Sequence, residues 1–558
     1  MSSLGVASGP RALDPDDIRL LRPAELGTPR RGGRRIWPLG LILAATLAAL
    51  WYATRGETAI FNSRGWPQFR EFFGAALHPA LDQAFLSVVW RATLVTLGYA
   101  VVGTALAVAI GLTLAVAGSQ AFGRGAPSSR AARAGRGLIR TVLVPMRAVH
   151  EAVWAVLLVQ VLGINPLVAI ISIGIPFGAV TARVYGQMLD DASSGSFVAL
   201  RAAGAGRLQA AIYGLLPEVG ANLIAYGCYR FECAIRAAAV LGVIGAGGLG
   251  FQIKVSFQSL AYDEMWTLLY VVIALCALAD GLSGRMRSRW RRASRDERRQ
   301  RQVVVARGLR VAALASVPIA WWYLNVHPST LWSERTVENA ERLGSELFPP
   351  RLPGTWGSLS GQCLETMAMS VLAIAIAVTG GIAMALVAAR PATSPSVTAR
   401  LGGLLARTVL LVARAIPPPV WAFVFLFIFF PGVVPGAIAL GVYNLGVLGR
   451  LMAELVENED DRPATNLRAT GAGRVQVFLY DRIPRLGQGF AALGVYRWEV
   501  AIRETVVVGL VAAGGLGAAL GQDIAAFDYP AITTTLLALI AVTAVADITG
   551  AWLRRALR

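Results

Sequence analysis

The sequence predicts an all-α integral membrane protein of two tandem six-helix halves, with about 12 transmembrane helices. One observation is composition: 55% of the 558 residues are hydrophobic and only 15% are charged. Apolar runs of about twenty residues, long enough to cross a bilayer, occur throughout both halves. The other observation is an internal repeat at a constant offset of 267 positions, which relates Arg201 to Arg468. A period this long indicates a duplicated domain and not a solenoid.

The repeat is dense and extends to both sides of its centre. Three motif pairs carry it: ALRAAGAGRLQAAIYGLLPEV (199–219) and NLRATGAGRVQVFLYDRIPRL (466–486), YRFECAIR (229–236) and YRWEVAIR (496–503), and AGGLG (246–250 and 513–517). Upstream, Arg147 and Arg183 find Arg414 and Arg450 at the same offset. Equivalent helices are therefore expected in the two halves.

The order of polar and apolar segments predicts the topology of the first half. Residues 1–35 are polar and arginine-bearing, which is typical of a disordered cytoplasmic tail and not of a cleaved signal peptide. Residues 36–284 form the first six-helix domain. Its predicted spans are residues 36–54, 84–117, 141–162, 166–185, 221–245 and 265–282. The arginine-rich linker, residues 285–302, is expected in the cytoplasm by the positive-inside rule.

The second domain, residues 303–558, repeats this plan. It has one span near residues 303–324 and five further spans that end at Trp552. Both termini are then expected in the cytoplasm, because an even number of spans in each half returns the chain to its starting side. The same even number makes the repeats parallel, with a pseudo-two-fold axis along the membrane normal. One pathway on that axis would be lined by both halves.

Composition and motifs exclude several classes of function. The formal net charge is +19, but the arginines lie between apolar segments, so a nucleic-acid partner is not expected. The four cysteines form no CxxC pair and the three histidines have no repeated counterpart, so no metal site is expected. Lys254, the chain's one lysine, lies in FQIKVS and cannot serve a GxxxxGK[ST] phosphate loop. We predict no bound cofactor and no catalytic residues.

The segment GAGGLG, residues 245–250, matches the G-x-G-x-x-G dinucleotide fingerprint. No βαβ unit surrounds it, and Ala512 replaces its first glycine in the other half. The glycines of both copies are instead predicted to let a helix end or a gate pack closely. This set is Gly245, Gly247, Gly248, Gly250, Gly514, Gly515 and Gly517.

The central repeated stretch is polar enough for a loop but has helical periodicity. In the first copy its inward positions recur every three to four residues from Leu200 to Leu215. Gly204 and Gly206 interrupt this pattern, and Pro217 is expected to close it. A helix, a glycine turn and a second helix would form a compact projection on the cytoplasmic face.

These residues resemble the cytoplasmic coupling loop of binding-protein-dependent ABC importer permeases, which pairs Glu-Ala-Ala with a later glycine and proline. With the YRxExxIR and GAGGxG motifs, the chain is similar to the phosphonate permease subfamily over residues 84–290 and 360–558. One departure matters, because the family's leading Glu is Val198 in the first half and Thr465 in the second. Any docking contact of that Glu is absent or replaced here.

The resemblance implies two fused permease domains in the cell membrane of a bacterium. It implies two copies of a cytoplasmic ATP-binding subunit, which hold ATP and Mg, and an extracytoplasmic phosphonate- or phosphate-binding protein; membrane lipid is the remaining partner. The ATPase-coupling residues would be Arg201, Gly204, Gly206, Arg207, Gln209, Pro217, Arg468, Gly471, Gly473, Arg474, Gln476 and Pro484.

Charged residues inside apolar segments predict a pathway for an anion. Charges at membrane depth are costly, so they are usually paired or line a route. Spacing i,i+4 predicts the pairs Glu232–Arg236 and Glu499–Arg503, which leaves Arg230 and Arg497 over. The predicted pathway residues are Arg147, Arg230, Glu232, Arg236, Arg414, Arg497, Glu499 and Arg503. Surplus guanidinium suits a tetrahedral oxyanion, but arginines that snorkel to the interface would give the same pattern.

The function expected from these features is ATP-driven import of a small phosphorus oxyanion. Phosphonate is the first expectation, and phosphate and phosphite stay open because each offers the same anionic oxygens. The alternative is a secondary active anion transporter of parallel two-repeat design. A channel is a third possibility, but it needs no coupling loop.

Overall fold

The computed structural model of the chain describes residues 37–55, 60–119, 130–192, 195–293, 312–351, 356–389, 397–460 and 462–557. Regular structure in these residues is helical, apart from an isolated antiparallel bridge between Phe61 and Phe429. The predicted tail, residues 1–35, and the predicted linker from residue 294 onward lie outside the described residues. The first part of that linker continues a helix as far as Ala293.

The helices follow the predicted order in both halves. The first half contains α1 (Trp37–Thr54), α2 (Trp66–Ala75), α3 (Gln83–Gly118), α4 (Arg130–Ala148), α5 (Glu151–Leu162), α6 (Pro166–Asp191), α7 (Gly195–Ala202), α8 (Arg207–Ala210), α9 (Leu216–Leu241), α10 (Gly248–Gln258) and α11 (Tyr262–Ala293). The second contains a helical segment at residues 312–323, α13 (Glu334–Glu346), α14 (Trp356–Ala388), α15 (Val397–Ala415), α16 (Pro418–Phe425), α17 (Val433–Glu457), α18 (Arg462–Ala469), α19 (Arg474–Val477), α20 (Ile483–Val508), α21 (Gly515–Ala525) and α22 (Tyr529–Leu557).

The described helices confirm an all-α membrane fold. Seven are long and apolar enough to cross a membrane, and four bent pairs qualify as further spans, which gives up to 11 in the described residues. The remaining predicted span, near residues 303–324, is described only from residue 312 and is helical there. Of the 11 candidates in the described residues, six lie in the first half and five in the second.

Two spans that look continuous in the sequence are sharply bent. The predicted span 141–162 is two helices, α4 and α5, which meet at 89°, and the equivalent α15 and α16 meet at 95°. The sequence analysis did not predict these bends, which arise because the backbone leaves helical geometry at His150 and at Pro417, where ψ is 147°. Nδ1 of His150 accepts the Ala152 N–H at 3.2 Å and so caps α5, whereas proline has no N–H with which to continue a helix.

The glycine motifs form a second pair of bends. After α9 the chain turns by 54° into α10, a short helix that the prediction omitted, and after α20 it turns by 47° into α21. Gly247 and Gly514 have φ angles of 88° and 86°, where a side chain would be strained. The next residues, Gly248 and Gly515, are also left-handed, with φ angles of 74° and 68°. The bend at this glycine run gives no clear signal in the hydropathy of the sequence, which is why α10 was missed.

The first helical segment of each half packs against the other half. Ala49 and Ala53 of α1 are buried in a cluster with Met369 and Ala373 of α14, so α1 packs on the second half. Conversely, Leu324, which follows the helical segment 312–323, is buried in the core of the first half. A β-carbon on Gly98 of α3 would lie 3.0 Å from Leu324. The two halves are therefore interlocked.

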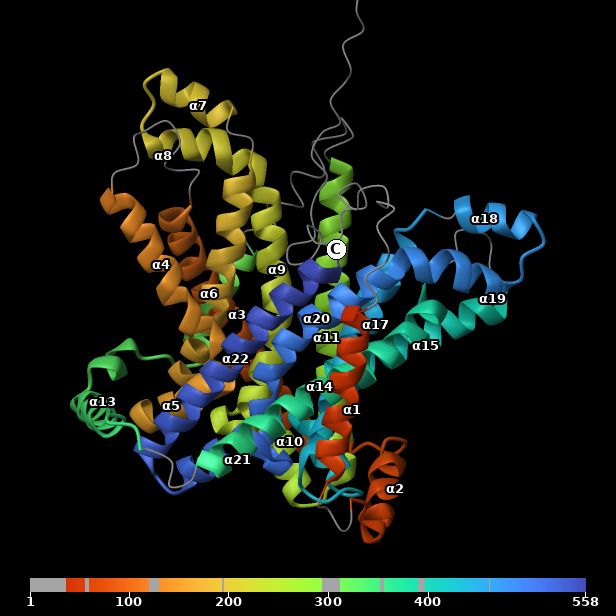
Figure 1. Cartoon of the computed structure of the whole chain (residues 1–558). Helices are drawn as coiled ribbons and strands as arrows, with labels where there is room; N and C mark the ends of the chain where they lie inside the picture. Colours follow the sequence, from red (N-terminus) through yellow and green to blue (C-terminus); the bar gives the residue numbers. More distant parts are fainter. Residues whose placement is uncertain are drawn as a thin grey trace, which may run out of the picture.

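The remaining contacts between the halves involve the bent spans. Val153 of α5 is buried among Val506 and Leu516 of the second half, while Val420 of α16 is buried in the first-half core with Ile253 of α10. Figure 1 shows α7 with α8, and α18 with α19, at one end of the bundle, and α2, α10, α13 and α21 toward the other. The centres of the Trp37 and Trp552 rings lie 5.1 Å apart with the ring planes tilted by 51°, so the two described ends of the chain lie together.

Candidate coupling segments and charged pathway

Two short projections, one from each half, lie toward the same end of the bundle (Figure 1). We call residues 195–219 the first knob and residues 462–486 the second knob. In the first knob, Gly204 has a φ of 89° and the Ala205 N–H donates to the Leu200 carbonyl at 3.0 Å. Gly471 has the same φ in the second knob. A left-handed glycine just after a helix is a common helix stop, and it makes the turn in both copies.

A glutamine side chain in each knob accepts a hydrogen bond from a backbone N–H of the turn. Oε1 of Gln209 accepts the N–H of Gly206 at 2.9 Å, and Oε1 of Gln476 accepts the N–H of Gly473 at 2.8 Å. These four predicted coupling residues therefore set the shape of the knobs.

Other side chains form the outer surface of the knobs. Nη1 of Arg201 donates to the Ala205 carbonyl at 2.6 Å and so belongs to the turn. Arg207 and Tyr213, by contrast, are exposed, Tyr213 by 74%. Its counterpart Tyr480 is 76% exposed, so the same aromatic side chain faces outward from both knobs. The sequence contained this pair in the repeat, but exposure could be assigned only from the fold.

The prediction that Pro217 ends the knob helix is wrong. The helix runs without a break from Arg207 to Ile244, and Pro217 lies in its interior, after the π-helical turn Ala211–Leu215. Pro484 follows the π-helical turn Phe478–Arg482 in the same way. A π-turn uses i→i+5 hydrogen bonds, so the wider turn can accommodate a residue without an N–H. Each knob is consequently continuous with a membrane span, α9 or α20.

The first knob is also anchored through its buried face. Phe197 of α7 is only 1% exposed and packs in a cluster with Tyr185 of α6. The same cluster contains Leu215, which directly precedes α9, and Tyr226 of α9. The equivalent position of the second knob, Ala464, is also 1% exposed. A force on the first knob would therefore reach two spans.

Charged side chains from both halves meet within the bundle. We call Glu232, Arg236, Asp280, Arg414 and Arg450 the Glu232 cluster. The Glu232 carboxylate lies 3.6 Å from Arg236 and 3.5 Å from Arg414. Asp280 pairs with Arg414 and, at 2.6 Å, with Arg450. The expected contact between Glu232 and Arg236 is thus one ion pair of a larger network, and this network joins α9 and α11 to α15 and α17.

The pairing predicted for the second half is wrong. In the described residues, Glu499 forms its ion pair with Arg554 of α22 and not with Arg503. Arg503 donates to two backbone carbonyls, that of Arg147 at 2.9 Å and that of Glu499 at 3.4 Å. Spacing i,i+4 allows two side chains to meet, but it cannot exclude a cation from another helix.

Arg497 is not left over, as the sequence suggested. Its guanidinium forms an ion pair with Glu504 at 2.6 Å and donates to the Asn444 side chain. Asn444 in turn donates to Glu504 at 3.2 Å, which closes a buried triangle between α17 and α20. The surplus of positive charge inferred for the second half is smaller than expected, since Glu504 was not counted.

Arg230, the equivalent residue of the first half, lies among aromatic rings. Its Nε donates to the Tyr226 hydroxyl at 2.8 Å. Its guanidinium carbon is 5.5 Å from the centre of the Phe177 ring and 5.6 Å from that of Tyr229. Cation–π contacts of this kind can hold an arginine within an apolar bundle.

Four charged residues of this region escaped the sequence analysis. They are Asp280, Glu504, Asp547 and Arg554. Asp280 and Asp547 are separated by the repeat offset, so a search for charged residues conserved between the halves would have found them. Glu504 and Arg554 had no such signal, because only the packing of helices brings them to their partners.

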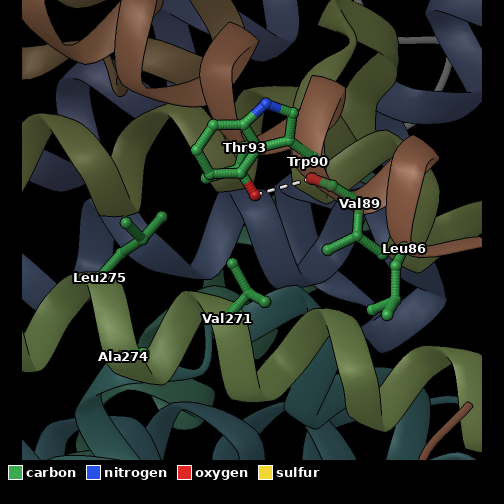
Figure 2. A pocket seen from close by; sticks show the side chains of 7 residues that line it. All are labelled: Leu86, Val89, Trp90, Thr93, Val271, Ala274 and Leu275. Carbon is green, nitrogen blue, oxygen red and sulfur yellow. Dashed lines mark hydrogen bonds between the residues drawn. The ribbon is translucent and has the colours of Figure 1, made fainter. Parts of the chain in front are cut away.

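The two hollows described on the surface lie away from these charges. One, of about 440 Å³, is an apolar groove between α3 and α11, lined by Leu86, Val89, Trp90, Thr93, Val271, Ala274 and Leu275 (Figure 2). The Thr93 hydroxyl there donates to the Val89 carbonyl at 2.7 Å. The other, of about 530 Å³, lies where α13 approaches the start of α22. Neither hollow contains a predicted pathway residue, and no group of His, Cys, Asp and Glu in the described residues is arranged to hold a metal.

Comparison with known families resolves the class of protein. Residues 123–292 and 377–558 match the model of the binding-protein-dependent transport system inner membrane component, one match in each half. The chain belongs to this family. It is therefore a multi-pass inner membrane permease and not an enzyme, and its family is that of ABC importers, which work with ATP-binding and substrate-binding subunits.

Individual relatives agree with the family match. A phosphate-import permease protein of Mycolicibacterium smegmatis is 24% identical over 91% of this chain and 92% of its own length. A phosphite transport system permease protein of Stutzerimonas stutzeri is 32% identical over 43% of this chain and 85% of its own length. A protein named for a cryptic phosphonate transport system of Escherichia coli is 33% identical over 19% of this chain and 88% of its own length. No solved structure matches the permease.

The ion pair of Arg497 yields a first prediction. Arg497→Gln should destabilise the purified permease by about 3 kcal/mol, because it leaves the buried Glu504 carboxylate without its cation. The double variant Arg497→Gln, Glu504→Gln should recover most of this loss. Thermal unfolding in detergent and the abundance of permease in membranes measure both effects.

A matched control comes from an exposed ion pair. Arg342 and Glu346 on α13 are 71% and 38% exposed, so water screens this pair and Arg342→Gln should leave the thermal unfolding of the permease unchanged. A double Arg497 and Glu504 variant as unstable as the single one would show that the pair is not the reason for the loss.

Proposed function

We propose that the permease carries a phosphorus oxyanion, namely phosphate, phosphite or a phosphonate, into the cytoplasm, driven by ATP hydrolysis on separate subunits. The observation that carries this proposal is the relative aligned over 91% of the chain, which is named as a phosphate-import permease. The names of shorter relatives add phosphite and phosphonate. The guanidinium groups within the bundle suit the anionic oxygens that these three ligands share.

The knobs are the proposed contacts for two ATP-binding subunits. Each knob carries the same glycine turn and the same outward tyrosine, so one chain offers two equivalent surfaces. Each is continuous with a span that carries pathway charges, Glu232 on α9 and Glu499 on α20. A change in the ATP-binding subunits can therefore reach these charges through an unbroken helix. An extracytoplasmic binding protein would deliver the anion at the opposite face.

Arg230 and the Glu232 cluster are the proposed pathway contacts of the anion. Arg230 is only 8% exposed and contacts Phe177 of α6 and Tyr226 of α9, so its guanidinium lies between these two helices. Arg497 is neutralised by Glu504 and has a structural role in this proposal.

Direct uptake tests the substrate and the energy source together. Cells that express the permease with its ATP-binding and substrate-binding subunits should accumulate at least one of phosphate, phosphite and 2-aminoethylphosphonate. Uptake should persist when a protonophore removes the ion gradient while ATP is maintained. Uptake that stops with the gradient would point to a secondary transporter, and no uptake of any of the three would contradict the proposal.

The glycine turns give a prediction about coupling. Gly204→Val with Gly471→Val should abolish transport-linked ATP hydrolysis while the permease still inserts, because valine is strained at a φ of 89°. The control is Gly220→Val with Gly487→Val, two equivalent helical glycines next to the knobs with open space at the β-carbon. The control pair should retain most of the stimulated ATPase rate. Equal activity in both double variants would refute the role of the turns.

The presence of both knobs in one chain gives a prediction about stoichiometry. Since one chain supplies both knobs, the purified complex should contain one permease chain and two ATP-binding subunits. Native mass spectrometry measures this directly, and two permease chains around a single pathway would be the contrary result.

A further inference from the structure

Besides Arg230 and Arg497, five charged positions within the bundle are shared by the two halves. At the repeat offset, Arg147, Arg183, Glu232, Arg236 and Asp280 correspond to Arg414, Arg450, Glu499, Arg503 and Asp547. Charged groups at membrane depth are expensive, and both copies of the domain carry the same five. Where these residues lie relative to the boundary between the halves therefore bears on what they do.

The Glu232 cluster crosses that boundary. Arg414 at the end of α15 reaches from the second half and pairs with both Glu232 on α9 and Asp280 on α11 of the first. Arg450 on α17 makes a second crossing to Asp280. The side chains of Glu232, Arg414 and Asp280 are 6%, 11% and 14% exposed, so water screens these pairs little.

The other copy of the cluster is arranged more loosely. Arg147 at the end of α4 interacts electrostatically with Asp547 and Glu499 of the second half and with Arg183 of its own. The Glu499 carboxylate, however, pairs with Arg554 within the second half. Among the residues that the structure describes, the Glu232 cluster is therefore the copy whose ion pairs join the two halves.

Both sides of the Glu232 cluster are connected to a knob. Glu232 lies on α9, which is one unbroken helix with the first knob from Arg207 onward. Arg450 lies about two turns before the end of α17 at Glu457, from which the chain enters the second knob. A rotation of either knob would move one side of the cluster against the other.

We propose that Asp280 and Arg450, together with Glu232 and Arg414, form a lock between the halves that must break for the pathway to open toward the knobs. This inference rests on the proposed function, because only a transporter needs the halves to separate in turn. Ion pairs between two interlocked bodies are either made or broken, so they define a discrete closed state. Breaking them leaves charged groups that water or the transported anion must solvate, which couples opening to the presence of either.

A native cysteine reports on this lock. Cys276 is 5% exposed and lies one turn before Asp280 on α11, on the same face, within electrostatic reach of Arg236, Arg414 and Glu232. Opening of the lock should expose its thiol. The test uses full-length permease with Cys276 as its single cysteine, made by Cys228→Ser, Cys233→Ser and Cys363→Ser. Modification by N-ethylmaleimide is followed in isolated membranes without substrate or ATP.

The decisive variant removes one charge of each sign. Asp280→Asn with Arg414→Gln keeps the net charge of the cluster, because one negative and one positive charge are removed together. The remaining charges keep a partner: Glu232 retains Arg236, and Arg450 retains Glu454. The modification rate of Cys276 should rise at least roughly tenfold, because the open state becomes more populated. The control Arg342→Gln with Glu346→Gln, an exposed pair on α13, should leave the rate unchanged. A rate within about twofold of the parent in the Asp280 and Arg414 variant overturns the proposal.

A second variant decides the matter if the first does not accumulate in membranes. Arg450→Gln with Glu454→Gln removes the more exposed limb and keeps the Asp280–Arg414 pair. It should raise the modification rate about threefold, and an unchanged rate overturns the lock. Because labelling needs neither anion nor ATP, its outcome is independent of the uptake experiment. Failed uptake with faster labelling would contradict the substrate assignment and leave the lock standing.

Discussion

The burial of charge between the two halves is the constraint on which the rest of the structure depends. Arg414 is only 11% exposed, and its guanidinium is stabilised by two carboxylates, Glu232 and Asp280, that both come from the other half. A guanidinium in an apolar bundle needs such partners, because water is not available to solvate it. The bend at Pro417, three residues later, places the end of α15 where it can reach them. The packing of α1 against α14 of the second half then helps to hold the two halves together.

The duplicated domains differ around an arginine that both of them carry. At the repeat offset, Asn444 takes the place of Phe177 and Glu504 takes the place of Ala237. As a result, Arg497 contacts an amide and a carboxylate at these two positions, whereas Arg230 contacts the Phe177 ring. The same arginine on the same helix therefore has two electrostatic environments. A fused chain permits this divergence, since each half can change without changing the other, which two identical subunits could not do.

The knobs connect this charged region to the end of the bundle. Because π-turns absorb Pro217 and Pro484, α9 and α20 each run from a knob into the span without a break. The glycine runs at the far end of these helices then turn the chain into α10 and α21. Each long helix is thus bounded by two places where the backbone departs from regular α-geometry, and the charged residues lie between them.

The sequence by itself determined the all-α membrane class, the two parallel halves and the glycine turns of the knobs, because hydropathy, repetition and left-handed glycine are properties of short stretches of chain. The sequence also contained the aspartates Asp280 and Asp547 at equivalent positions of the repeat, which a comparison at the repeat offset would have revealed. Only the tertiary structure decided which charges meet. Local spacing predicted that Glu499 pairs with Arg503, but Arg554 of another helix takes that place. The reason is physical: ion pairing depends on how helices rotate and cross, and on which half supplies each first helix, and neither is specified by separation along the chain.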